Sequence, residues 1–173
     1  MKVMLRYPLH ASPEQFWEAF FDPDTTSRMH LEALGSTSVE IEELTGTPAT
    51  GIERTIRYAQ VPDAPGPVKR LFGSEVVTTE VGSFDPDTGV WHFSLTPATL
   101  ADKTEITGTI EILDTGYDGT DDGQPGYEQV FSLEARVRIF GAGPVVERFI
   151  EKQARDTQDR AAAFLGALLD GVG

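Results

Sequence analysis

The longest helical pattern in the sequence is its last one, from Gly143 to Leu169, and it limits the folds open to this chain. Pro144 suits a first helical turn, where the amide hydrogen that it lacks would have no partner. Gly171 supplies a stop signal. At ~1.5 Å per residue, roughly 26 residues extend about 39 Å, the width of a small domain. The rest of the chain must therefore be organised around this helix.

One stripe of this helix is apolar at both ends and polar in the middle. At ~100° per residue the stripe contains Val146, Phe149, Ile150, Ala161, Phe164, Ala167 and Leu168. Gln153 and Thr157 lie at its centre, with Arg160 on its shoulder. This break indicates that something other than packed side chains lies beneath the middle of the helix. The alternative is that the polar layer meets solvent or a buried hydrogen-bond partner.

Composition excludes several classes of function. The chain has 173 residues, which fits one domain spanning 1–173, and it contains no cysteine, so disulfides and thiolate metal sites are impossible. A net charge of −14 makes the protein acidic and argues against nucleic acid as a partner. No stretch approaches the ~20 apolar residues that span a bilayer, so we expect no stable membrane insertion and a cytoplasmic location.

The spacing of apolar residues changes along the chain between the helical and the strand pattern, and these changes predict the order of the helices and strands. Ser12 to Gln15 reads as a capping box that begins a helix, and Asp22-Pro23 begins a second helix, which Gly35 ends. Alternating apolar residues predict strands on both sides of this helix pair. These strands lie at 2–7, 37–43, 52–58, 74–84, 91–95, 105–113 and 127–140.

This order predicts an α+β fold. A curved, mostly antiparallel sheet of seven strands would wrap around the long C-terminal helix, with two short helices between strands 1 and 2. A strongly curved sheet around one helix leaves space for a pocket between them. The proline-rich segment 61–67 and the short helix expected at 68–72 form the best candidate for a mobile lid.

Three segments carry a resemblance to a known family: YPLHASPEQFWEAFFDPDTTSRMHLEALG at 7–35, PGPVKRLFGSEV at 65–76, and VRIFGAGPVVERFIEKQ at 137–153. The chain resembles the START-like (Bet v 1-type, SRPBCC) helix-grip superfamily over nearly its whole length. Within it, the chain is similar to a bacterial family of unknown function, DUF2505. The resemblance implies a helix-grip fold. Members of the superfamily bind lipids, sterols, polyketides or plant hormones, some are polyketide cyclases or aromatases, and others are protein-interaction modules.

Catalytic and metal-binding signatures are weak. His10, His30 and His92 share no ligand spacing, and His30 is the one that could point into a pocket mouth. No nucleophile elbow, phosphate loop or dinucleotide fingerprint occurs, so we expect no cofactor and no metal. The loop 118–123 partly mimics a calcium loop through Asp118 and Asp122, but Gln129 stands where a bidentate Glu belongs. A solvated hairpin loop is the favoured interpretation.

The second and third predicted strands form a hairpin, and alternation predicts that Arg54 and Glu43 both point to its inner face. If Glu43 lies near Ile52, Arg54 sits diagonally across from it. The two charges would then pair or meet a polar ligand group, because an unpaired buried charge is costly. Alternatively, this end of the hairpin is open to water and both charges are solvated.

The favoured hypothesis is a non-enzymatic binding or carrier protein for a small hydrophobic ligand of lipid, isoprenoid or polyketide type. Gln153 and Thr157, together with Arg54, would orient the polar group of the ligand. The expected ligand-binding residues are Tyr7, His30, Arg54, Ile56, Tyr58, Trp91, Phe93, Ile110, Phe131, Leu133, Gln153 and Thr157.

Two other classes of function stay open. The first is a polyketide cyclase or aromatase-like enzyme, in which Arg54, His30 or Tyr58 would act as acid-base groups. The second is a protein-interaction module without a ligand, which would use its acidic surface or the segment 61–73.

Overall fold

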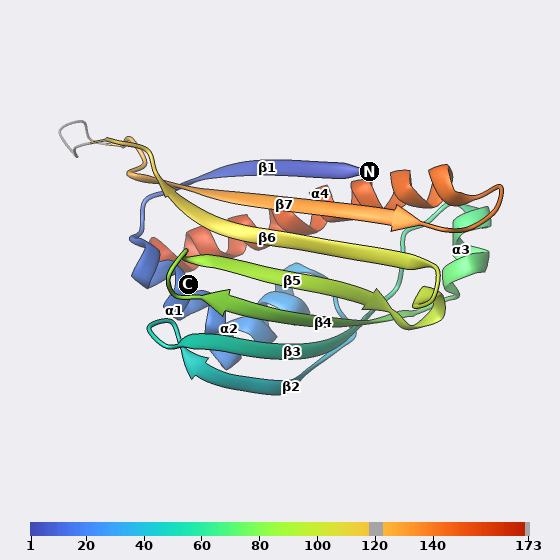
Figure 1. Cartoon of the computed structure of the whole chain (residues 1–173), viewed down its shortest axis with the longest axis horizontal. Coiled ribbons are helices and arrows are strands. Elements are labelled where there is room, and N and C mark those ends of the chain that lie inside the picture. Colours follow the sequence, from blue (N-terminus) through green and yellow to red (C-terminus); the bar gives the residue numbers. More distant parts are fainter. Residues whose placement is uncertain (118–122, 172–173) are drawn as a thin grey trace.

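The chain forms a seven-stranded antiparallel sheet in the order β1-β7-β6-β5-β4-β3-β2, as Figure 1 shows. The computed structural model describes residues 1–117 and 123–171. The strands are β1 (Lys2–Leu9), β2 (Ser38–Thr47), β3 (Gly51–Gln60), β4 (Val76–Asp85), β5 (Val90–Pro97), β6 (Thr104–Asp114) and β7 (Tyr127–Val137). This arrangement confirms the predicted helix-grip α+β fold.

The helices gather on one side of the sheet, and the longest of them runs behind it from one end to the other (Figure 1). This helix, α4, packs against β7 and β1 and also contacts α1 and α3. The helical elements are α1 (Pro13–Phe21), α2 (Pro23–Arg28), the π-helical turn η1 (Met29–Ala33), α3 (Gly66–Phe72), the 3₁₀ turn η2 (Ala98–Leu100) and α4 (Gly143–Leu169).

The first helix pair forms through the predicted capping. The Ser12 hydroxyl accepts a hydrogen bond from the Gln15 amide at 3.2 Å, and the Gln15 side chain accepts one from the Ser12 amide at 2.9 Å. The Asp22 carboxylate then caps α2 through the Thr25 amide at 2.8 Å. Helix α2 continues into η1, and Gly35, with φ of 69°, ends the segment. The Asp-Pro break thus separates α1 from α2, as the sequence predicted.

The aromatic residues of α1 belong to the hydrophobic core. Trp17 lies against Phe84 with ring centroids 4.7 Å apart, and Phe21 lies 5.3 Å from Trp91. Phe16 is fully buried. These contacts fix α1 over the inner face of β4 and β5.

Two glycines make room for large rings on the inner face of the sheet. A side chain at Gly82 would collide with the indole of Trp91, and one at Gly108 would collide with the ring of Phe93. Each glycine stands in the strand next to its aromatic ring. The rings therefore lie across the backbone of neighbouring strands, and this leaves open space above them.

Several details of the elements differ from the predictions, such as β2, which runs to Thr47 instead of ending near residue 43. Strand β7 ends at Val137 instead of continuing to Phe140, because the chain turns there and the Ala142 amide bonds the Ile139 carbonyl. In α4 the buried stripe includes Leu165, which the predicted stripe omitted, whereas Ala167 is exposed. The predicted bounds of α4 are confirmed, whereas α3 begins at Gly66 instead of at residue 68.

Candidate ligand-binding cavity

A cavity of about 430 Å³ lies between the concave face of the sheet and α4. Its floor is formed by inward residues of the central strands β4 to β7, and its roof by α4. The largest apolar side chains that border it are Phe20, Phe72, Trp91, Phe93, Phe131 and Phe149. The long helix thus does not pack directly onto the middle of the sheet.

The residues that the sequence nominated for ligand binding converge on this cavity, except Tyr7. Those that border it are His30, Arg54, Ile56, Tyr58, Trp91, Phe93, Ile110, Phe131, Leu133, Gln153 and Thr157. Tyr7 lies outside the lining on β1, and its hydroxyl donates to the Asp159 carboxylate at 2.6 Å. Partial burial and this carboxylate raise the pKa of the Tyr7 phenol above its usual range. The role of the nominated residues in binding stays a prediction.

The polar middle of α4 borders the entrance of the cavity. Gln153 and Thr157 line the cavity, and so do the exposed Lys152 and Arg160 next to them. The segment 61–63, which joins β3 to α3 and is exposed at both of its ends, borders the same cavity from the other side. Because lining residues that are also exposed mark an opening, the mouth lies between this segment and α4. This position explains why the helix interrupts its apolar stripe.

An ion pair forms the polar wall on β3 and β4. The Arg54 Nη2 atom lies 3.0 Å from the Glu80 carboxylate, and Arg54 Nη1 donates to the Phe20 carbonyl at 3.0 Å. This carbonyl belongs to the last turn of α1, where carbonyl groups lack helical partners. The guanidinium also lies 4.6 Å from the Phe20 ring centroid and 5.0 Å from that of Trp91.

The suggested pairing of Arg54 with Glu43 is wrong, and the alternative in which both charges are solvated holds for Glu43 alone, because Arg54 is 4% exposed. The register of β2 against β3 shifts between Ile41 and Glu43, so Glu43 pairs with Thr55 and Leu44 takes the place opposite Arg54. A bulge of this kind turns every following side chain to the other face of the strand. Glu43 is therefore exposed, and Glu80 of β4 provides the counter-charge for Arg54.

His30 reaches the cavity from the π-helical turn η1. Its ring centroid lies 4.7 Å from that of Tyr58, and its Nδ1 atom lies 3.2 Å from the Ser36 hydroxyl. Burial, and then the positive charge of Arg54, lower the pKa of His30 to about 4. Burial, followed by the Glu80 charge, raises the pKa of the Tyr58 phenol above its usual range. At neutral pH this corner therefore holds a neutral imidazole and a protonated phenol.

Sequence reasoning missed several polar residues that border the cavity, among them Thr78, Glu80, Gln129 and Gln158. Gln129 shares its alternation with Phe131 and Leu133, so the inward phase of β7 contained the signal. Glu80 likewise shares the phase of Gly82 and Phe84. Gln158 stands beside Thr157 in α4 and is the more buried of the two.

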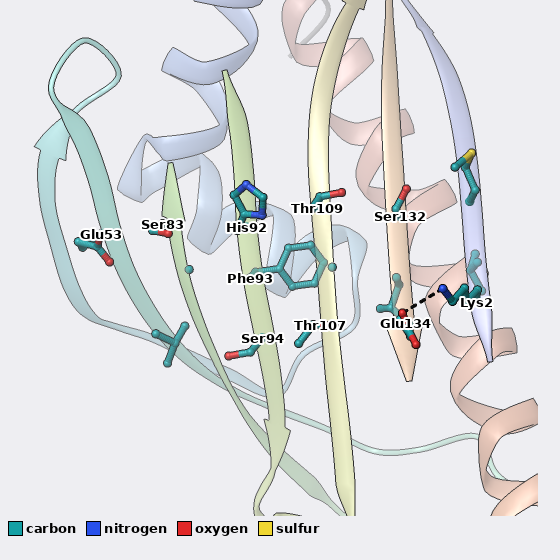
Figure 2. A pocket seen from close by; sticks show the side chains of 16 residues that line it. Lys2, Glu53, Ser83, His92, Phe93, Ser94, Thr107, Thr109, Ser132 and Glu134 are labelled. Carbon is teal, nitrogen blue, oxygen red and sulfur yellow. Dashed lines mark ion pairs between the residues drawn. The ribbon is translucent and has the colours of Figure 1, made fainter. Parts of the chain in front are cut away.

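A second hollow, of about 700 Å³, lies on the outer face of the sheet. Figure 2 shows its labelled side chains spread over separate strands, among them the hydroxyls of Ser94, Thr107 and Thr109. The ion pair between Lys2 and Glu134, at 3.3 Å, lies at its margin. Although larger, this hollow is an open, solvated face of the sheet, whereas the cavity beneath α4 is more enclosed and is therefore the better ligand site.

The arrangement of the described residues bears on metal binding and on membrane insertion. No group of three or more potential ligands stands together among residues 1–117 and 123–171. The calcium-like loop falls largely outside the described residues, since these exclude Asp118 and Asp122. Among the described helices, none combines the length and apolar character needed to cross a membrane. His10 and His92 are exposed.

The fold and the enclosed cavity define a helix-grip protein, in which a curved sheet surrounds a long C-terminal helix. The chain belongs to the DUF2505 family, described as proteins of unknown function, whose sequence profile matches residues 4–169. The resemblance inferred from the sequence is thereby confirmed. No curated protein is similar to the chain in sequence at a significant level.

Several solved structures share this fold. The Zhui aromatase/cyclase from Streptomyces sp. R1128 has a TM-score of 0.66 at 14% identity, covering 100% of this chain and 98% of that one. TTHA0849 from Thermus thermophilus has a TM-score of 0.65 at 17% identity, covering 97% of this chain and 99% of that one. A START superfamily protein from Mycobacterium smegmatis has a TM-score of 0.60 at 14% identity, covering 99% of both chains. At these identities the similarity shows the fold alone.

Proposed function

We propose that this chain is a non-enzymatic binding or carrier protein for a small hydrophobic molecule of lipid, isoprenoid or polyketide type. The observation that carries the proposal is the cavity of about 430 Å³ beneath α4. Its volume falls within the range of ~300–1,000 Å³ that is typical of small-molecule sites. A helix and a sheet that only stabilised one another would close this space with side chains.

The proportion of apolar to polar side chains in the cavity walls supports a mostly apolar ligand with few polar groups. Aromatic and aliphatic side chains cover the floor, and the polar groups stand at defined places: the Arg54–Glu80 pair on one wall, Gln153 and Thr157 at the mouth. Apolar walls supply affinity in proportion to the area that they remove from water. The few polar groups orient the ligand, because any that stay unpaired reduce its affinity.

Native mass spectrometry of freshly purified protein tests this function, with solvent extraction and analysis of whatever is released. The expected result is a mass above that of the chain, and a small hydrophobic compound in the extract. A consistently empty protein that also fails to bind neutral hydrophobic probes would remove the proposal.

A second candidate is an enzyme of the cyclase or aromatase type. Arg54, His30 and Tyr58 all border the one cavity, and the fold is similar to that of the Zhui aromatase/cyclase. With a pKa of about 4, His30 is a weak base at neutral pH, which speaks against acid-base work there. The test is incubation with a linear poly-β-ketone. A dehydrated, cyclised product that the triple variant His30→Ala, Arg54→Met, Tyr58→Phe no longer forms would favour this candidate.

A further inference from the structure

Two glutamine side chains lie inside the molecule with no hydrogen-bond partner among the described residues. Gln129 on β7 is 3% exposed and Gln158 on α4 is 8% exposed. Neither side-chain amide makes a hydrogen bond within the described part of the chain. A primary amide offers two donors and a carbonyl acceptor, and leaving these unpaired in an interior is costly. The two amides therefore require an explanation.

Both glutamines border the cavity. Gln129 and Gln158 belong to its lining. Among the described side chains, Arg54 Nε is the one polar atom that is fully enclosed and unpartnered. The polar atoms of the two glutamines are not fully enclosed in this way, and the cavity is an open space that both residues border.

The glutamines and the ion pair occupy opposite sides of the cavity. Gln129 of β7 pairs with Tyr7 of the edge strand β1. The Tyr7 hydroxyl donates a hydrogen bond to Asp159 of α4, so the turn of α4 that contains Gln158 lies near the same edge of the sheet. Glu80 stands on β4, three strands away in the sheet order. Between them runs an apolar row of Phe131, Ile110 and Trp91 across β7, β6 and β5. One cavity therefore has two polar walls separated by an apolar floor.

We propose that Gln129 and Gln158 form a second polar subsite, which binds an uncharged hydrogen-bonding group of the ligand, such as a hydroxyl or a carbonyl. The inference rests on the proposed ligand-binding function and narrows the ligand class. An amide donates and accepts hydrogen bonds but carries no net charge. It can therefore pair with a neutral polar group of the ligand, but it does not offset the cost of burying a charged group. The ligand then has an apolar body with a polar group near each end.

A lipid with a single polar head fits this cavity less well. Its head can occupy either polar wall, and its apolar tail then covers the other wall and leaves buried polar groups unpaired. A site built to bond a hydroxyl or carbonyl discriminates strongly against an analogue that lacks the group. Two polar walls therefore select for molecules with two separated polar groups.

The test compares 1-dodecanol with 1,12-dodecanediol, two compounds with the same carbon chain. The affinity of each compound is measured by displacement of the neutral fluorophore N-phenyl-1-naphthylamine. The measurement is made on wild-type protein and on the variants Gln129→Leu and Gln158→Leu. Each leucine variant is expected to weaken diol binding about tenfold, the loss of one or two buried hydrogen bonds. The affinity for 1-dodecanol should change less than twofold or rise. The exposed-residue control Gln124→Leu should leave both affinities unchanged.

Other outcomes overturn the inference. If the leucine variants lost equal affinity for the diol and the monoalcohol, or lost affinity for neither, the amides would be solvated by water and would not select a ligand. If a leucine variant fails to fold, the unbranched replacements Gln129→Met and Gln158→Met carry the same comparison. If wild-type protein binds neither the fluorophore nor the alcohols, the proposed ligand-binding function itself fails, and this inference fails with it.

Discussion

Arg54 and Glu80 form an ion pair across β3 and β4, with Arg54 Nη2 lying 3.0 Å from Glu80 Oε1. The residue directly opposite Arg54 is Gly82, so the guanidinium extends diagonally to Glu80 without a side chain in the way. Side-chain exposures of 3% and 17% make the pair a largely buried one. It joins the sheet to the last turn of α1 through the Phe20 carbonyl, and it borders the cavity.

Replacing Glu80 with Gln is expected to destabilise the protein by about 3 kcal/mol, because Arg54 would keep a buried charge without its partner. Urea unfolding at neutral pH measures the change in the free energy of unfolding. The double variant Arg54→Met, Glu80→Leu should be less destabilised than the sum of its single variants, since it leaves no lone charge.

Glu40→Gln is the matched control for this prediction, because Glu40 is exposed on β2. It should change stability by less than ~0.5 kcal/mol. If Glu80→Gln behaved like this control, the ion pair would contribute nothing to the fold.

Gly82→Ala is expected to destabilise the protein by about 1–3 kcal/mol, because the added methyl group would collide with the buried indole of Trp91. The temperature midpoint of unfolding should fall accordingly. At Gly66 an added methyl group meets open space, so Gly66→Ala should leave the midpoint near that of the wild type. Equal midpoints for the two variants would contradict the close packing of Trp91 over β4.

His30 is expected to make folding stability depend on pH. Its pKa is about 4 in the folded protein and ~6.5 when unfolded, so the unfolded state binds the proton more readily between these values. The stabilisation is thus fully present above pH ~6.5 and is lost as pH falls toward ~4. From pH 7 to pH 5 the loss amounts to about 2 kcal/mol.

Urea unfolding at these two pH values tests this dependence in wild type and in His30→Asn. The variant should lose about 2 kcal/mol less than the wild type on acidification, whereas the exposed-residue variant His92→Gln should follow the wild type. Identical pH dependence in all three proteins would show that His30 is not buried as a neutral group.

The elements with strong periodicity could be predicted from the sequence. Pro144 and Gly171 bracket a helix whose bounds are those predicted, and alternation identified all seven strands. Long periodic segments carry their own signal, because burial of one face repeats along the chain. The inward strand residues, such as Trp91 and Phe93, followed from the same alternation, and this placed most of the nominated residues around one cavity.

The polar part of the cavity could not be predicted, because it depends on register. The bulge after Ile41 leaves no mark in the sequence, yet it moves Glu43 to the outer face. Glu80 stands 26 residues from Arg54 in the chain, and only the sheet order makes them neighbours. The alternation of β7 could have placed Gln129 on the inner face of the sheet. A polar residue at an inward position, however, conflicts with the usual pattern of strands.

Affinity should rise with ligand length until the cavity is full. Each buried methylene contributes ~0.8 kcal/mol, so the dissociation constant should fall about fourfold per carbon along a series of straight-chain alcohols. Displacement of N-phenyl-1-naphthylamine measures the series from 1-octanol to 1-hexadecanol. A plateau marks the length at which the space of about 430 Å³ is filled. Affinities that do not vary with length would contradict an apolar, enclosed site.

The most direct test of the central claim is a fluorescence titration of delipidated protein with N-phenyl-1-naphthylamine. We predict saturable binding of one molecule per chain, about tenfold weaker in Thr157→Phe, whose new ring would fill the cavity beneath α4. Ala163→Phe, on the exposed side of the same helix, should bind like the wild type. Absence of saturable binding by folded wild-type protein, or equal binding by Thr157→Phe, would contradict a ligand site between α4 and the sheet.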